Sequence, residues 1–174
     1  LYGTKTLFVR LAGCPFTCFY CDTKESLPLD SGTEYTIDEA NELIDSNLQN
    51  QTYKVNFTGG DPLIQHQAVA QLAKHIQNKK IPTYLESSCF DIDRFNHVLP
   101  FIDIVKIEFK TKGGHTLLQL LDGSGTILKV LVEATYNYPG MNSYNLYGSG
   151  MAPGVYYIRL QNEDKIFVKA IIKM

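Results

Sequence analysis

Three cysteines near the N-terminus have a spacing that suits an iron–sulfur cluster. Cys14, Cys18 and Cys21 form a CxxxCxxC pattern and lie too close together to staple a fold through disulfides. Cysteine thiolates bind iron–sulfur clusters, and a cube of four irons needs four ligands. Three cysteines from one loop can therefore hold three irons and leave the fourth iron open, as a reactive metal centre requires. The pattern predicts a cluster site.

Two other interpretations of these cysteines stay open. Structural zinc takes four protein ligands, usually as two pairs. The histidines that could complete such a site are distant in the sequence and unpaired: His66, His75, His97 and His115. Cys89 could in principle be a fourth ligand, although a buried, small apolar role fits it better. The spacing could also be a coincidence with no metal.

A glycine-containing turn follows an apolar segment in Thr58-Gly59-Gly60-Asp61-Pro62. Two glycines let a ligand meet the backbone without interference from a Cβ atom. Asp61 adds an acceptor that suits an ammonium group, and Pro62 stiffens the exit toward the next helix. Taken alone, we favour an ordinary strand-to-helix connection for this turn, with a ligand-binding turn as the alternative.

The elements that position these residues alternate between strands and helices. The predicted strands cover residues 6–11, 54–58, 82–86 and 103–109, and the predicted helices cover 36–48, 65–77 and 92–99. Thr36 and Glu39 have the spacing of a capping box at the start of the first helix. Such alternation indicates an α/β fold with a parallel sheet, whose ligands bind at the C-terminal ends of the strands. We predict a partial parallel (βα) barrel of about four units in a first domain, residues 1–112.

The pattern changes after about residue 112, and no helical periodicity follows. Predicted strands cover residues 116–121, 126–134, 143–147, 155–161 and 165–172, separated by turns at 122–125, 139–140 and 162–164. The last of these strands alternates its side chains with a period of two. We predict an antiparallel β-meander or small sandwich in a second domain, residues 113–174.

Composition limits the classes of function. The chain has 174 residues, 44% of them apolar and 20% charged, which indicates a soluble globular protein. A net charge of −2 gives no reason to expect nucleic acid or an anionic membrane as a partner. No apolar run is long enough to cross a bilayer, and the first residues show no secretory signal. Free thiols suit the reducing cytosol. Leu1 in place of a methionine suggests a missing N-terminal piece.

Together, the cysteine loop and the glycine turn resemble the radical S-adenosylmethionine superfamily. The closer similarity is to the 7-carboxy-7-deazaguanine synthase group, in residues 8–14, 21–23 and 58–62, and it covers roughly residues 4–112. It implies that the three loop cysteines hold a [4Fe–4S] cluster and that S-adenosylmethionine occupies the fourth iron. It further implies contacts to this cofactor from Tyr20, Cys21, Asp22, Gly60 and Ser87.

The same resemblance implies a substrate site and a reaction. Arg10 would hold a substrate carboxylate, for which a guanidinium is well shaped, Thr58 would contact the substrate, and Thr23 would bind Mg²⁺. S-adenosylmethionine would be cleaved reductively to a 5′-deoxyadenosyl radical. The substrate would be pterin-like: 6-carboxytetrahydropterin, contracted to 7-carboxy-7-deazaguanine with loss of ammonia, a lyase step of queuosine biosynthesis. A one-electron donor such as flavodoxin or ferredoxin would be a partner, and a homodimer stays open.

Each of these assignments has a structural alternative. Arg10 could be a surface cation, Thr23 could cap a turn, and Ser87 could satisfy nearby backbone groups. Charged residues alternate along the fourth predicted strand, where we favour a solvated or barrel-lining role over a catalytic one: Lys106, Glu108 and Lys110.

The C-terminal part resembles a different family, the sorting domain of the type IX secretion system, in residues 121–126, 151–156 and 168–173. An export address conflicts with an oxygen-sensitive cytosolic enzyme. The resemblances also imply six barrel units and a glutamine- and glycine-rich leader, where we predict four units preceded by Leu1-Tyr2-Gly3. The alternatives to an enzyme are therefore a chimeric or truncated protein without turnover, whose tail is a sorting or adhesion module, and a zinc-binding structural protein.

Overall fold

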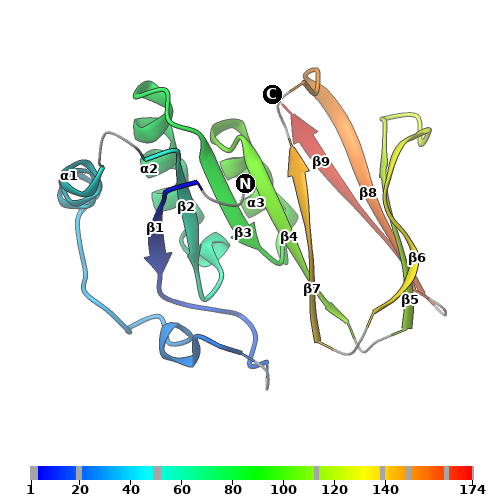
Figure 1. Cartoon of the computed structure of the whole chain (residues 1–174), viewed down its shortest axis with the longest axis horizontal. Coiled ribbons are helices and arrows are strands. Elements are labelled where there is room, and N and C mark those ends of the chain that lie inside the picture. The colour runs from blue at the N-terminus through cyan, green and yellow to red at the C-terminus, as the bar shows by residue number, and fades with distance from the viewer. Residues whose placement is uncertain are drawn as a thin grey trace.

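The computed structural model describes residues 4–18, 21–48, 52–111, 114–137, 140–147, 150–162 and 165–173. These residues form two β-sheets and three α-helices (Figure 1). The strands are β1 (Thr6–Leu11), β2 (Lys54–Gly59), β3 (Thr83–Ser87), β4 (Ile104–Thr111), β5 (Gly114–Leu121), β6 (Ile127–Asn137), β7 (Gly140–Tyr147), β8 (Gly154–Asn162) and β9 (Lys165–Lys173). The helices are α1 (Ile37–Asn47), α2 (His66–Asn78) and α3 (Ile92–Val98), with short 3₁₀ turns η1 (Lys24–Ser26), η2 (Pro62–Gln65) and η3 (Leu99–Phe101).

The first sheet has the strand order β1-β2-β3-β4-β7. Strands β1 to β4 are parallel to one another, and β7 runs antiparallel to β4. The predicted parallel α/β architecture is therefore confirmed for the first four strands. The predicted barrel is not confirmed, because the described strands form a sheet with β1 at one edge and β7 at the other.

Local signals explain why the helices form where they do. The capping box predicted at the start of α1 is present: the Glu39 amide donates to Thr36 Oγ1 at 3.3 Å, and the Thr36 amide donates to Glu39 Oε2 at 2.8 Å. Such a cap stabilises a helix by about 1 kcal/mol.

Figure 1 shows α2 and α3 on the same side of the first sheet. The sheet's apolar side chains pack in this layer, including the fully buried Val55, Phe57 and Leu85.

The second sheet is antiparallel, with the strand order β6-β5-β8-β9. This confirms the change of architecture predicted for the C-terminal part. One strand of that part lies elsewhere: β7 pairs with β4 along its whole length, from Ile104 opposite Tyr147 to Thr111 opposite Gly140. A tail strand thus covers the edge that the parallel strands would otherwise leave unpaired. The predicted domain division falls at residues 112 and 113, which lie outside the described residues.

The two sheets share one hydrophobic core. Buried side chains of the second sheet, such as Leu118 and Ile171, belong to the same cluster as Phe57 and Phe95. Strand β9 packs against α3, and Leu146 of β7 faces Val105 across the β4–β7 pair. In the described part of the chain, no helix is long and apolar enough to cross a membrane.

Candidate functional site

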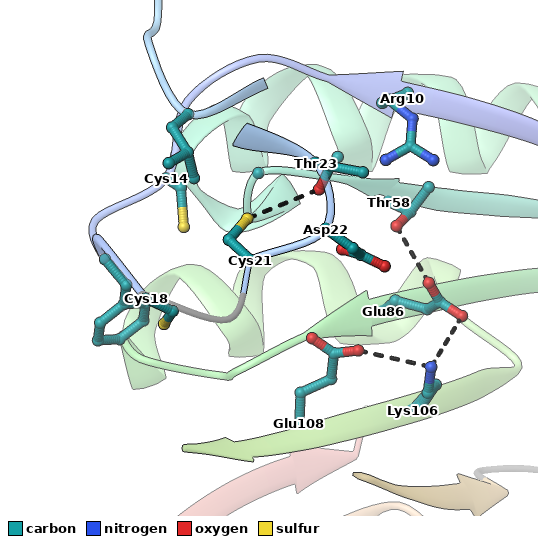
Figure 2. A pocket seen from close by; sticks show the side chains of 14 residues that line it. Arg10, Cys14, Cys18, Cys21, Asp22, Thr23, Thr58, Glu86, Lys106 and Glu108 are labelled. Atoms are coloured by element: carbon teal, nitrogen blue, oxygen red, sulfur yellow. Dashed lines mark hydrogen bonds and ion pairs between the residues drawn. The ribbon is translucent and has the colours of Figure 1, made fainter. Parts of the chain in front are cut away.

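A pocket of about 160 Å³ lies at the C-terminal ends of the parallel strands. It brings together eight residues with a predicted metal, cofactor or substrate role: Arg10, Cys14, Cys18, Cys21, Asp22, Thr23, Thr58 and Gly60. Figure 2 shows the three cysteines at one end of the pocket and Arg10, Thr58, Glu86 and Lys106 at the other. Tyr20 lies outside the described residues. The assembly of these residues in one place makes this pocket the candidate site.

The cysteines are carried by a loop that leaves β1 and is closed at its base. The Gly13 amide donates to the Ser26 carbonyl at 2.9 Å, and the Cys14 amide donates to the Leu27 carbonyl at 3.1 Å. Inside the loop, the Cys21 amide donates to the Cys18 carbonyl at 3.1 Å. These backbone bonds hold the three thiols on one short, closed segment beside the pocket.

Two other metals were considered at the cysteine end of the pocket, zinc and magnesium. Among the described residues, no group of three His, Cys, Asp or Glu side chains is arranged to hold a single metal ion. The zinc alternative therefore has no preformed site in that part of the chain. Thr23 lies beside the cysteines, with its hydroxyl oxygen 3.9 Å from Cys21 Sγ. Its role as a magnesium ligand stays a prediction.

A polar network forms the other end of the pocket and crosses the sheet from strand to strand. Arg10 of β1 is in register with Thr58 of β2, whose hydroxyl donates to Glu86 Oε2 at 3.0 Å. Lys106 Nζ lies 3.4 Å from Glu86 Oε1 and 3.5 Å from Glu108 Oε1. Arg10 is exposed, Thr58 is buried, and Glu86, Lys106 and Glu108 are partly buried. Because these side chains carry charges of both signs, this wall can bind a ligand with an anionic group and hydrogen-bond donors.

Sequence reasoning identified most of this wall but missed Glu86. Lys106 and Glu108, for which we favoured a solvated or barrel-lining role, line the pocket, whereas the side chain of Lys110 lies outside the described part. Glu86 stands opposite Lys106 in the β3–β4 register.

Burial, followed by the nearby Glu86 charge, raises the pKa of Tyr84 to about 12. This phenol therefore stays protonated and donates to Asn145 Oδ1 at 2.7 Å.

The glycine pair is packed closely against the backbone of neighbouring segments. A Cβ atom on Gly60 would lie 2.3 Å from the Gly13 carbonyl oxygen, and one on Gly59 would lie 2.0 Å from the Leu11 carbonyl oxygen. Gly59 also has a φ of +136°, a region that favours glycine. The Gly60 amide donates to the Leu11 carbonyl at 3.1 Å. Gly59 therefore makes room for the end of β1, and Gly60 makes room for the base of the cysteine loop. Both glycines also line the pocket, and the approach of a ligand to their backbone stays a prediction.

Asp61 and Ser87 form a buried structural link. Asp61 is 3% exposed, and its carboxylate accepts hydrogen bonds from Leu63 N, Ser87 Oγ, Ser88 N and Ser88 Oγ. The predicted ammonium partner for Asp61 is wrong, because its oxygens are already used within the protein. Ser87 is 1% exposed and, among the described residues, is not part of the pocket lining. Its contact with a cofactor stays a prediction.

Cys89 lies apart from the other three cysteines. It is buried, with its thiol 3.9 Å from the Ser87 carbonyl oxygen, and it does not belong to the described pocket lining. Burial raises the pKa of the Cys89 thiol, which keeps it neutral. The expected role as a small buried residue is confirmed, and a ligand role has no support.

The close packing at Gly60 leads to a testable result. Gly60→Ala should push the cysteine loop away from the turn and lower iron uptake at least severalfold, because the neighbouring atoms are backbone and cannot rotate aside. Gly154→Ala is a matched control, since a Cβ there meets only a Tyr156 ring atom at 3.8 Å. Iron content after anaerobic reconstitution is the measurement. Equal iron in the two variants would contradict this account of the glycine turn.

Comparisons with known proteins agree with both resemblances seen in the sequence. Residues 2–125 match the family model described as a 4Fe-4S single cluster domain. Residues 99–174 match that of a secretion system C-terminal sorting domain. The two matches overlap in residues 99–125, which include β4 of the first sheet and β5 of the second.

Several curated relatives carry one name, 7-carboxy-7-deazaguanine synthase. The protein from Methanocaldococcus jannaschii is 30% identical over 122 residues, which cover 63% of this chain and 49% of that protein. The one from Archaeoglobus fulgidus is 31% identical over 115 residues, covering 63% and 48%. The one from Pyrobaculum aerophilum is 43% identical over 72 residues, covering 41% and 32%. The chain spans about half the length, or less, of these relatives.

Proposed function

Since the chain belongs to the family of 4Fe-4S single cluster domains, we propose that its pocket binds a [4Fe–4S] cluster together with S-adenosylmethionine. The observation that carries this proposal is the pocket itself: three thiols of one closed loop at one end and a charged, hydrogen-bonded wall at the other. Three cysteines leave one iron of such a cluster without a protein ligand, so a small molecule can bind there.

Each end of the pocket would have its own task. Cys14, Cys18 and Cys21 would hold three irons, and Asp22 and Gly60 would lie along S-adenosylmethionine. When bound, the cluster supplies one electron to the sulfonium of S-adenosylmethionine and so gives access to hydrogen-atom abstraction. The protein's own part is to orient the reactants and to keep the cysteine loop closed.

We further propose that the product is the 7-carboxy-7-deazaguanine of the relatives' name. The substrate would then be the carboxylated pterin that the sequence resemblance implies, converted in a lyase step. The Arg10 guanidinium would pair with the substrate carboxylate. Thr58, held by Glu86, would contact the substrate, and Mg²⁺ would bind at Thr23. A flavodoxin or ferredoxin in the cytoplasm would supply the electron.

A second candidate function rests on the match of residues 99–174 to a sorting domain. Such a domain would address the protein for export, with no turnover in the pocket. Its test is the export of a reporter fused to this full chain in a bacterium that has the corresponding secretion system. Retention of the reporter inside the cell would rule out this function.

Anaerobic reconstitution with iron and sulfide separates these functions. We expect about four irons per chain and a broad visible absorbance that dithionite bleaches. Addition of S-adenosylmethionine and dithionite should then release methionine, which can be measured by chromatography. A colourless protein that takes up zinc in place of iron would overturn the proposal. A bleachable cluster without methionine release would restrict it to cluster binding.

A further inference from the structure

The last strand of the chain is bonded to the segment that follows β3. Lys169 Nζ of β9 donates to the Cys89 carbonyl at 3.0 Å and to the Phe90 carbonyl at 3.2 Å. Three residues further along, β9 is at the edge of its sheet, and the Ile172 amide donates to Asn96 Oδ1 of α3 at 3.0 Å. The tail therefore touches the first sheet's loops directly as well as through the core.

The segment held by Lys169 in turn contacts the cysteine loop. The Phe90 ring meets the Phe16 ring edge to face, with centroids 6.2 Å apart and an interplanar angle of 89°. Phe16 lines the pocket and lies between Cys14 and Cys18 in the sequence. Such aromatic pairs add specific attraction to simple burial. Movement of Phe90 would therefore reach the residues beside the thiols.

A second route joins the same segment to the base of the loop. Ser88 donates to Asp61 Oδ2 through its amide at 3.0 Å and through its hydroxyl at 2.6 Å, and the Asp61 amide donates to the Gly13 carbonyl at 2.8 Å. The next residue, Cys89, has a φ of +53°, which is disfavoured for a residue with a side chain. Such a conformation persists only where neighbouring contacts hold it.

We propose that the C-terminal β unit positions the cysteine loop, with Lys169 as the positioning residue. By holding the Cys89 and Phe90 carbonyls, Lys169 fixes the Cys89 backbone and keeps Phe90 against Phe16. A hydrogen bond from a charged donor to a carbonyl is stronger than a neutral one. The consequence for the site is slower opening of the loop and slower loss of a bound cluster. This inference rests on the proposed function only in naming that cluster.

The test compares lysine variants of the full chain. Lys169→Met keeps the length of the side chain and removes the donor, Lys169→Arg keeps a donor, and Lys129→Met is a matched control on β6 of the same sheet. After anaerobic reconstitution, the rate of iron transfer to a ferrous chelator is measured. We expect release from Lys169→Met to be roughly threefold to tenfold faster than from Lys129→Met. Lys169→Arg should release iron at close to the original rate.

A second measurement keeps the outcome separate from cluster binding. In the metal-free chain, amide hydrogen exchange at Gly13 and Cys14 reports on the base of the loop, because both amides are hydrogen-bonded there. We expect faster exchange at both in Lys169→Met than in Lys129→Met. Equal exchange and equal iron release would overturn the role of Lys169. If the unmodified chain takes up no iron, the proposed function fails, and exchange alone still decides this inference.

Discussion

Replacing Cys14, Cys18 or Cys21 by alanine should remove most of the iron that the chain retains after anaerobic reconstitution. The three thiols come from one closed loop and line the same pocket, so two remaining thiols cannot hold one face of a four-iron cube. We expect the iron content and the visible absorbance of each single variant to fall to a small fraction of the original. Colorimetric iron analysis and absorbance spectra measure both.

Cys89→Ala provides the matched control for that result. Its thiol is buried beside the Ser87 carbonyl, and its raised pKa keeps it in the neutral form that does not bind iron. We expect this variant to keep its iron, with no more than a small loss of stability from removing one buried sulfur. If Cys89→Ala loses as much iron as Cys18→Ala, the assignment of the ligands is wrong.

Local patterns allowed much of the fold to be predicted from the sequence. Strand β1 was predicted with its observed bounds, and α1 begins at the capping box formed by Thr36 and Glu39. Both depend on side chains a few residues apart, so the sequence contains the whole signal. The CxxxCxxC pattern is local in the same way, and the structure places its cysteines together at one pocket.

Long-range contacts could not be predicted in this way. Residues 143–147 were predicted as a strand, but the pairing of β7 with β4 depends on a partner about 40 residues away. The same limit applies to the glycine turn. The sequence contains a glycine and a carboxylate, but the packing of Gly60 against the Gly13 backbone depends on the fold. The hydrogen bonds that the Asp61 carboxylate accepts from Ser87 and Ser88 depend on the fold in the same way.

The place of β7 also changes the expected role of the tail. A β-rich part of this kind can fold alone as a sandwich on a linker, or its strands can cover the edge of the first sheet. The structure shows the second arrangement, with β7 beside β4, β9 packed on α3, and buried side chains of β5, β8 and β9 in the shared core. All described residues of the pocket lining lie between Arg10 and Glu108, so the tail supplies none of them. The tail therefore acts on the site through its contacts with the first sheet and its loops.

Deleting residues 113–174 should therefore leave a chain that aggregates. The deletion removes the strand that pairs with the full length of β4, and it exposes core side chains such as Val105 and Ile107. An unpaired, apolar strand edge is a ready site for pairing with other chains. Solubility after expression and the size distribution in gel filtration measure this outcome. A soluble deletion variant with full iron content would show that the two parts are independent.

A point variant tests the same dependence without removing any strand. Leu146 is 5% exposed and Tyr147, its neighbour on the opposite face of β7, is 49% exposed. Leu146→Asp should destabilise the whole chain by roughly 3 kcal/mol or more, because it removes core packing and buries a carboxylate. For a chain of this size, that loss lowers the melting temperature by about 6–12 °C. Tyr147→Asp should change it little, so equal melting temperatures by circular dichroism would mean that β7 is not part of a shared core.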